Sequence, residues 1–512
     1  GGGEAFDTIQ DAVESGQWKP GQNFDFVVRN VKARVSMQSN VGAVNAAAAG
    51  SAIDSLAALA ADVDRRCNAA PREASMKGYA PWKAPDIIPR SDLGLDAINY
   101  DGSENEMIGA EVMDALRNHG YLIVDVNEGM GLGESEQMER SLASMWRSTD
   151  KFFDAAAKAS EAGGENELVP PMQVAEGVGS RHAVFGYTSY DEGAMRFLET
   201  RVLREKQSIL PREMEKVLGG DDLAGLLDSF HVLADIGRDI VRVAVAAASV
   251  EKEAFLEADM AGPSEDGPSI SGLSLEETGF SASPQKRASE AAIKAASAAL
   301  RMVDELVDDG RPCLDLPIEE SPVSMSPHRM CRYSGSGKSS ETDAKEVFGA
   351  HTDTSFVTMI PVAAVSGLEV FDESANAWVR PEIIARRHFE EERESRGFDP
   401  NIDKVEVTVN DMTEKRPWHA RYAIAMPGEL LQVVTRGSVN AAVHRVVAAV
   451  EGQPRLSAPV LLRARTKATM DIQRYFVDGN ADDKETKIGK LLRDCEGMTM
   501  YDIHDRLQPG RS

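Results

Sequence analysis

Gly349-Ala350-His351-Thr352-Asp353-Thr354-Ser355-Phe356 is the stretch of sequence that decides the fold and the chemistry of this chain. In a β-strand, residues i and i+2 point to the same face, so the imidazole of His351 and the carboxylate of Asp353 would project together. Ala442-Val443-His444-Arg445-Val446-Val447 is typical of a second apolar strand that could bring His444 beside them. Two neutral imidazoles and one carboxylate on one face of an octahedral metal leave three positions open. This arrangement suits Fe(II), a chelating co-substrate and O2.

A candidate anion site follows shortly after the second histidine. Arg455-Leu456-Ser457 places a guanidinium and a hydroxyl on one face of a further strand, which suits bidentate capture of a carboxylate. Each piece also has an ordinary explanation, because a lone His on a strand is more often a core or surface residue, and Arg455 could be a surface Arg. The combination favours a metal site with an anionic co-substrate beside it.

The C-terminal half of the chain carries the pattern of a β-sandwich or barrel. From about Val323 onward, short apolar runs are separated by Gly and Pro. These runs are Phe356 to Val362, Leu368 to Phe371, Arg421 to Met426, Leu430 to Thr435, Ala442 to Val450 and Ala458 to Leu462. The charged stretch 383–416 lacks the periodicity of a helix face or of a strand, so we expect a surface insertion outside the iron-binding shell.

The N-terminal half is predicted to be mostly helical. A helix ending at Gly120 precedes a buried strand at Tyr121 to Val124, since glycine suits a helix C-cap. Residues at helical spacing predict further helices, namely Ile53, Leu56, Leu59 and Val63, then Leu226, Phe230, Leu233, Gly237 and Ile240, and then Ile293, Leu300, Val303 and Val307. The segment 261–283 is dense in Gly, Ser and Pro and is predicted to be a loop. Ser334 to Lys338 is predicted to be a flexible loop that could cover the site.

These patterns divide the chain of 512 residues into four parts. Residues 1–84 form an extension that is partly helical, and 85–322 a helical region with the insert near 261–283. Residues 323–470 form the β-rich core with the insertion near 383–416, and 471–512 a helical tail. No internal repeat is visible.

Composition excludes several classes of function. A formal net charge of -27 argues against a general nucleic-acid or anionic-membrane binder, because phosphate recognition needs a basic footprint. No apolar run reaches the length of a transmembrane helix. The four cysteines lack metal-type spacing and are expected to be thiols of a reducing compartment. The sequence begins with Gly1 and not with Met, which leaves room for a removed targeting segment, and we expect a soluble intracellular protein of the cytoplasm or of a plastid.

The motifs together resemble the Fe(II)/2-oxoglutarate-dependent dioxygenases of the isopenicillin N synthase-like group. The pieces in the family's order are Gly349 to Thr358, Ser366 to Phe371 with Trp378, Pro427 to Gln432, Val443 to Val446 and Arg455 to Ser457. The resemblance is close over 323–470 and looser over 85–250. It implies an α+β fold with a double-stranded β-helix core, a jelly-roll or cupin-like barrel, and flanking helices.

The resemblance also implies roles for individual residues. His351, Asp353 and His444 would bind Fe(II), and Arg455 and Ser457 would bind the far carboxylate of the 2-oxoglutarate co-substrate. Tyr333 would contact that co-substrate, although Cys331 stands where the family has Asn, which puts one hydrogen bond in doubt. Glu429 stands where the family usually has Asp, and Thr435-Arg436-Gly437 where it usually has Ser-Asn-Gly.

The implied activity is an oxygenase that hydroxylates, desaturates or cyclises a small organic metabolite and releases succinate and CO2. O2 and a small-molecule substrate of specialised metabolism are the expected partners, ascorbate is a further candidate cofactor, and a monomer is expected. Two alternatives stay open: an iron-dependent oxidase of the same fold that does not consume 2-oxoglutarate, and a ligand-binding protein that has lost catalysis. Retention of all three metal ligands argues against the second alternative.

Overall fold

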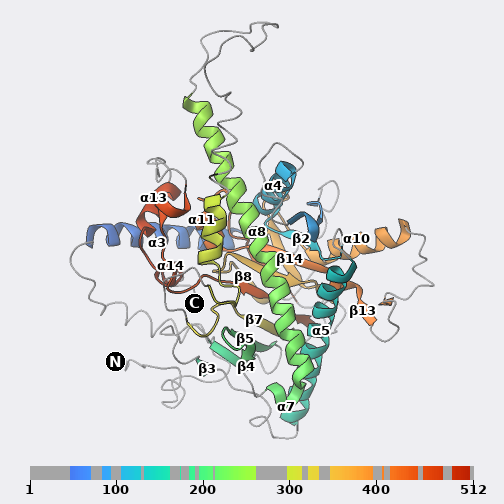
Figure 1. The fold of residues 1–512 in the computed structure, drawn as a ribbon. Helices are drawn as coiled ribbons and strands as arrows, with labels where there is room; N and C mark the ends of the chain where they lie inside the picture. The colour runs from blue at the N-terminus through green and yellow to red at the C-terminus, as the bar shows by residue number, and fades with distance from the viewer. Residues whose placement is uncertain are drawn as a thin grey trace.

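The protein is a mixed α/β structure with two main β-sheets and several helices (Figure 1). The computed structural model describes residues 46–70, 84–93, 105–127, 132–161, 173–174, 184–190, 195–210, 214–260, 294, 297–313, 321–333, 346–395, 406–408, 415–447, 454–476 and 487–507. The predicted loops at 261–283 and 334–338 lie outside these residues. Within the described part of the chain, no helix is long and apolar enough to cross a membrane. All four cysteines fall within the described residues, and none is in a disulfide.

The larger sheet has eleven strands in the order β1-β2-β14-β9-β17-β7-β5-β4-β3, with β16 paired to β7 and β6 paired to β5. Its strands are β1 (Ile88–Pro89), β2 (Leu122–Asp125), β3 (Gln173–Val174), β4 (Val184–Tyr190), β5 (Met195–Leu203), β6 (Ser208–Leu210), β7 (His328–Tyr333), β9 (Val357–Pro361), β14 (Tyr422–Pro427), β16 (Arg455–Ser457) and β17 (Val460–Leu462).

The smaller sheet has the order β11-β10-β15-β8. Its strands are β8 (Glu346–His351), β10 (Leu368–Asp372), β11 (Ala377–Val379) and β15 (His444–Val447). Along the chain, β7, β9, β14 and β16 belong to the larger sheet, while β8, β10, β11 and β15 belong to the smaller one. The chain therefore passes repeatedly between the two sheets.

The two sheets share a buried apolar interior. Ile360 and Ile424 of the larger sheet belong to one core cluster with Leu368 and Val370 of the smaller sheet. The sheets therefore pack face to face, as in a β-sandwich. The described strands make two separate sheets, and no closed barrel is formed among them, in contrast to the barrel that the sequence pattern suggested.

Helices cover the outer face of the larger sheet. The long helix α8 (Gly220–Met260) crosses it beside α5 (Leu132–Glu161) in Figure 1. The predicted apolar stripe is confirmed, because Phe230, Leu233 and Ile240 are fully buried. A Cβ on Gly237 would lie 2.5 Å from Leu462 and 2.9 Å from Met359, so glycine lets the helix approach the sheet closely.

The N-terminal predictions are confirmed where residues are described. Helix α4 (Asn105–Asp114) continues as a π-helical turn, Ala115–His119, and ends at Gly120 with φ +73°, directly before the buried strand β2. Helix α3 (Ala46–Ala69) buries Leu56 in one core cluster with apolar residues of α13 (Lys487–Cys495) and α14 (Met500–Leu507). The C-terminal tail is therefore helical and packs on the N-terminal helix.

Two predictions of secondary structure are wrong. The run Leu430 to Thr435 forms helix α11 (Glu429–Val434) and not a strand, because a short apolar run that is buried on all sides fits either structure. The stretch expected to be a surface insertion begins inside helix α10 (Pro381–Ser395). Ala385 and Phe389 are buried, with Phe389 beside Trp418. One face of α10 therefore packs on the core, and between α10 and β13 (Lys415–Pro417) only β12 (Glu406–Thr408) is described.

The remaining elements are short. They are β12 (Glu406–Thr408) paired with β13 (Lys415–Pro417), the helical turns Arg90–Leu93 and Trp418–Arg421, α7 (Glu215–Leu218) and α12 (Ile472–Tyr475). Residues 297–306 are helical, as predicted, and bury Met302, Val303 and Leu306. Of the other positions predicted for this helix, Leu300 is half-buried, Val307 is buried just after the helix, and Ile293 lies outside the described residues.

Candidate metal centre

Three of the predicted site residues meet at one end of the smaller sheet. Strands β8 and β15 pair antiparallel with His351 directly opposite His444, and their ring centroids lie 4.1 Å apart. Asp353 follows β8 by two residues. Its carboxylate oxygens lie 3.9 Å from Nε2 of His351 and 3.6 Å from Nε2 of His444. The three side chains each turn one potential ligand atom toward a common point, within 4.8 Å of one another.

Backbone carbonyls fix the tautomer of both imidazoles. Nδ1 of His351 lies 2.8 Å from the carbonyl of Gly349, and Nδ1 of His444 lies 3.2 Å from the carbonyl of Ala442. A carbonyl can only accept, so each Nδ1 carries the proton and each Nε2 presents its lone pair toward Asp353. Metal-binding histidines are typically oriented in this way.

The electrostatics of the cluster also suit a cation. Partial burial and the neighbouring His444 imidazole lower the pKa of His351 to about 3, so His351 is neutral at neutral pH. Burial alone would raise the pKa of Asp353, but His444, His351 and the hydroxyl of Thr358 lower it below its usual range. The cluster therefore holds two nitrogen donors and one carboxylate, which are ligands that divalent transition metals accept.

A buried carboxylate organises the loop that carries Asp353. Glu429 is fully buried and accepts hydrogen bonds from the hydroxyls of Thr352, at 2.6 Å, and Thr354, at 3.0 Å. Its backbone N–H donates to the carbonyl of Asp353 at 2.9 Å. A Cβ on Gly428 would lie 2.2 Å from the carbonyl oxygen of Ser355, so only glycine lets α11 start this close to the loop.

The other side of Asp353 is held by a hydroxyl. Thr358 donates to Oδ2 of Asp353 at 2.6 Å, and its Oγ1 also lies 3.1 Å from the hydroxyl of Ser355. Thr358 lies on β9, so a strand of the larger sheet positions a carboxylate that follows the smaller sheet. Neither Thr358 nor Glu429 was assigned a role from the sequence. Both residues could have been singled out from the sequence, because Thr358 ends the motif Gly349 to Thr358 and Glu429 lies in the motif Pro427 to Gln432.

Arg455, Ser457 and Tyr333 lie together on the larger sheet. Strand β16 pairs with β7 so that Arg455 is opposite Tyr333 and Ser457 is opposite Cys331. The Arg455 guanidinium lies 5.5 Å from the centre of the Tyr333 ring. Burial raises the pKa of Cys331 to about 11 and raises the pKa of Tyr333 well above its usual value, so both side chains are neutral.

Arg455 has an acidic partner that the sequence did not reveal. Its Nη2 donates to Glu382 at 2.7 Å, and both side chains are only 1% exposed. Glu382 lies in the first turn of α10 and also accepts from the backbone N–H groups of Gly367 and Leu368. Nε and Nη1 of Arg455 are buried and have no hydrogen-bond partner among the described residues. Arg455 is therefore charge-paired at Nη2 and buried without an acceptor at Nε and Nη1.

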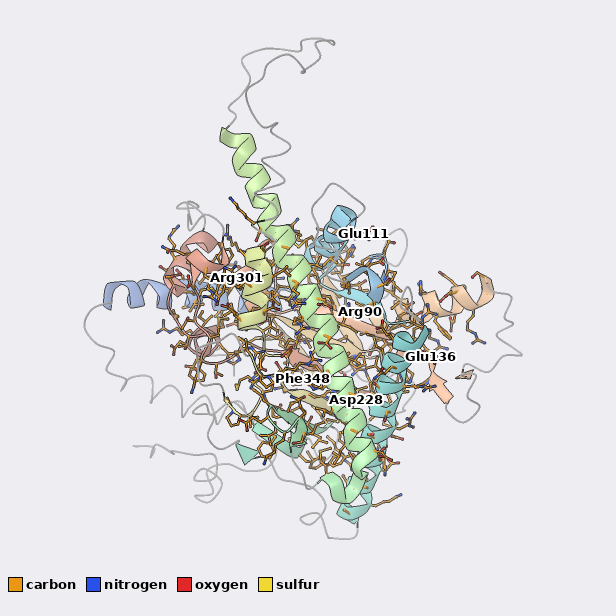
Figure 2. All side chains as sticks on the ribbon, viewed as in Figure 1. Arg90, Glu111, Glu136, Asp228, Arg301 and Phe348 are labelled. Atoms are coloured by element: carbon orange, nitrogen blue, oxygen red, sulfur yellow. The ribbon has the colours of Figure 1, made fainter. Side chains whose placement is uncertain are left out.

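One exposed aromatic side chain borders the metal centre. Residues 444 and 446 of β15 face residues 351 and 348 of β8, so a β-bulge places Phe348 on the same face as His351. The two rings are 4.6 Å apart. At 41% exposure, Phe348 is the one large hydrophobic side chain that is exposed in the described part of the chain (Figure 2). The centre therefore opens to solvent on the side of His351 and Phe348.

Comparisons with known proteins give weak likenesses. No protein-family model matches the chain, and no curated protein matches it. Among solved structures, it is similar to the dioxygenase for auxin oxidation of rice, with 14% identity over 74% of this chain and 83% of that chain and a TM-score of 0.38. A full-length protein of Neurospora crassa in complex with alpha-KG gives 14% identity, coverage of 82% of this chain and 94% of that chain, and a TM-score of 0.42.

A third similar structure is the 2-oxoglutarate complex of dioxygenase for auxin oxidation 1 from Arabidopsis thaliana. It has 13% identity over 74% of this chain and 93% of that chain, with a TM-score of 0.36. TM-scores below 0.5 are too low to assign a fold or an activity to this protein. Its function has to be inferred from the geometry of its own residues.

Proposed function

We propose that this protein is a non-haem Fe(II) oxygenase that uses 2-oxoglutarate and acts on a small organic metabolite within a jelly-roll core. The observation that carries the proposal is the convergence of His351, Asp353 and His444, with both imidazoles held as the Nδ1–H tautomer. Two imidazoles and one carboxylate are the ligand set of non-haem Fe(II) oxygenases. The alternation of β7 to β17 between two facing sheets supports a jelly-roll.

The residues present fit an Fe(II) ion. In this proposal Nε2 of both histidines and one carboxylate oxygen of Asp353 hold the metal, and Thr358 and Glu429 keep Asp353 in position. One carboxylate against a divalent cation leaves a net charge of about +1, which attracts an anionic co-substrate. Fe(II), when bound, would supply the electrons with which O2 is activated.

The residues also fit 2-oxoglutarate. Nε and Nη1 of Arg455 are buried donors without a partner among the described residues, and leaving such donors unpaired costs about 1–3 kcal/mol each. A carboxylate that accepts from these two donors, with the hydroxyl of Ser457 on the same strand face, would satisfy them. Tyr333 would form the wall of that pocket.

Two measurements test the proposal. Anaerobic titration of the full chain with Fe(II), followed by calorimetry, should show one bound ion, and adding 2-oxoglutarate should produce a visible charge-transfer band. In air the loaded protein should release succinate from 2-oxoglutarate, slowly without substrate and faster with it. A protein that binds no Fe(II), or that binds it and releases no succinate, contradicts the proposal.

A second candidate, an iron oxidase that does not consume 2-oxoglutarate, is favoured by one observation. Glu382 already pairs with Arg455 and reduces the positive charge that a co-substrate would meet. Arg455→Ala separates the two candidates. If Arg455 anchors 2-oxoglutarate, the Arg455→Ala variant loses a charge-assisted contact of ~2–4 kcal/mol. The apparent dissociation constant of 2-oxoglutarate then rises roughly 30- to 1000-fold. Substrate oxidation without succinate release, unchanged in Arg455→Ala, supports the oxidase.

A further inference from the structure

A second arginine, distinct in role from Arg455, faces the same interior. Arg463 directly follows β17, where Leu461 is opposite Thr358 of β9. Residues two apart on a strand share a face, so Arg463 lies on the face of Leu461 and Thr358. Thr358 is the residue that donates to Asp353. Arg463 and Asp353 are close enough to interact electrostatically.

Arg463 is buried and unpartnered. It is only 9% exposed, and its Nε is buried without a hydrogen-bond partner. In the described part of the chain, no side chain or carbonyl accepts a hydrogen bond from its guanidinium, whereas the nearby Arg465 bonds to Asp309 and to the carbonyl of Arg311. An unpaired buried donor such as Nε of Arg463 is costly, and with no acceptor for the rest of the guanidinium among the described residues this points to a ligand that supplies one.

The surroundings of Arg463 are positively charged. Arg201 and Arg329 lie near it on strands β5 and β7, and both pair with one carboxylate, Glu199. Three guanidinium groups against two carboxylates, Glu199 and Asp353, leave a net charge of +1. Burial and the two neighbouring arginines lower the pKa of Arg463 to about 9, so it is still charged at neutral pH. This part of the interior therefore attracts a further anion.

The register places this group, which we call the arginine cluster (Arg201, Arg329, Arg463), on the inner face of the larger sheet. Glu199 is opposite Arg329, and Arg455 is opposite Tyr333, which lies four residues further along β7. Residues 329, 331 and 333 share one face of β7, so the arginine cluster and Arg455 are separate positions on that face. The interior thus holds two cationic positions near one metal centre.

We propose that Arg463 binds the carboxylate of the primary substrate, which makes the substrate class a small organic acid. The inference rests on the proposed function, because it assigns Arg455 to the co-substrate and Arg463 to the molecule that is oxidised. The planar guanidinium fork matches a carboxylate in a bidentate geometry. Phe348, exposed beside His351, offers an apolar surface to the body of the acid.

The test uses the full chain loaded with Mn(II), which does not turn over, and 2-oxoglutarate. The probes are phenylacetate, 4-hydroxybenzoate and octanoate, each compared with its primary amide by calorimetry and by thermal melting. The wild-type protein should bind at least one acid roughly 30-fold or more tightly than its amide. In Arg463→Met this ratio should fall to about 1–3. Arg332→Met is the matched control, since Arg332 lies on the outer face of β7 and pairs with Asp154.

Each outcome decides the question. An acid preference in the wild type that survives in Arg463→Met, or no acid preference for any probe, overturns the inference. An Arg463→Met protein that loses affinity for 2-oxoglutarate and keeps it for the acids makes Arg463 the co-substrate anchor and also overturns it. Failure of the proposed function is seen separately, because such a protein binds no Fe(II) or releases no succinate whatever the probes do.

Discussion

Two clusters of histidine and carboxylate side chains in this protein look alike by residue type and differ in charge. The metal triad (His351, Asp353, His444) and a second cluster (Asp125, His388, Glu392) each gather three potential ligand atoms within 4.8 Å. In the second cluster, Arg421 donates to both carboxylate oxygens of Asp125 at 2.9 Å and also pairs with Glu392.

The counter-charge decides which cluster can hold a metal. Arg421 supplies the cation that Asp125 and Glu392 need, and Nδ1 of His388 is engaged by the hydroxyl of Tyr422 at 3.0 Å. In the described structure around the triad, Asp353 accepts from Thr358 and faces two imidazoles, of which His351 is held neutral. A metal ion at the triad would balance the negative charge of Asp353, whereas at the second cluster it would be repelled by Arg421.

The largest expected effect tests this difference directly. Asp353→Ala should abolish Fe(II) binding measured by anaerobic calorimetry, because it removes the only anionic ligand of the triad. Asp125→Ala, the matched control, should leave the Fe(II) affinity within about threefold while lowering the free energy of unfolding. Equal Fe(II) binding by the wild type and Asp353→Ala would show that the metal, if any, lies elsewhere.

Replacing Arg421 should lower the free energy of unfolding and leave Fe(II) binding unchanged. Arg421→Met leaves the fully buried carboxylate of Asp125 without its partner, and breaking a buried ion pair in this way costs about 3–5 kcal/mol. Urea unfolding measures the loss. Arg386→Met is the control, because the Arg386–Glu390 pair is exposed and should contribute less than about 0.5 kcal/mol. A loss below about 1 kcal/mol for Arg421→Met would contradict our interpretation of the second cluster.

Acidification should reveal a buried neutral histidine next to the second cluster. Burial lowers the pKa of His419 to about 4, and its Nδ1 donates to the carbonyl of Val362. The unfolded chain, with a His pKa of about 6.5, binds the proton first, so stability falls as pH drops from about 6.5 toward 4.

The contribution of His419 between about pH 6.5 and 5 should be roughly 1.5 kcal/mol. It is measured as the difference in pH dependence between the parent and His419→Gln. Both proteins should carry Asp353→Ala, so that metal loss does not contribute. Identical slopes of unfolding free energy against pH would show that His419 is not held neutral.

The smallest expected effect concerns the support of the triad. Glu429→Gln keeps the shape of the side chain but leaves Thr352 or Thr354 without a carboxylate acceptor. Outer partners of metal ligands typically change metal affinity by about 10- to 100-fold, and we expect the lower end. Tyr422→Phe removes the corresponding partner of His388 and should leave Fe(II) affinity unchanged. Unaltered affinity in Glu429→Gln would assign Glu429 to folding alone.

Local periodicity explains why much of this protein could be predicted from its sequence. The strand around His444 and the Arg455-Leu456-Ser457 pair depend on the two-residue repeat of a strand. The strand expected through His351 ends at that residue, and Asp353 reaches the site from the loop that follows. The stripe from Leu226 to Ile240 depends on the helical repeat, and Gly120 on its backbone freedom. Such features depend only on residues close together in the chain, so they can be predicted from the sequence.

The tertiary structure alone decided the partners of these residues. Glu382 reaches Arg455 across 73 positions and Glu429 reaches Thr352 across 77, and neither pairing has a local signature. Helix α11 was misread because burial on all sides removes the polar face by which a helix is recognised. Helix α10 keeps an exposed charged face, which includes the Arg386–Glu390 pair, and buries Ala385 and Phe389 at a helical spacing of four residues. The sequence determined which groups can bind a metal or an anion. Which of them lack a counter-charge depends on long-range contacts, since charge compensation is a property of space and not of the order of residues.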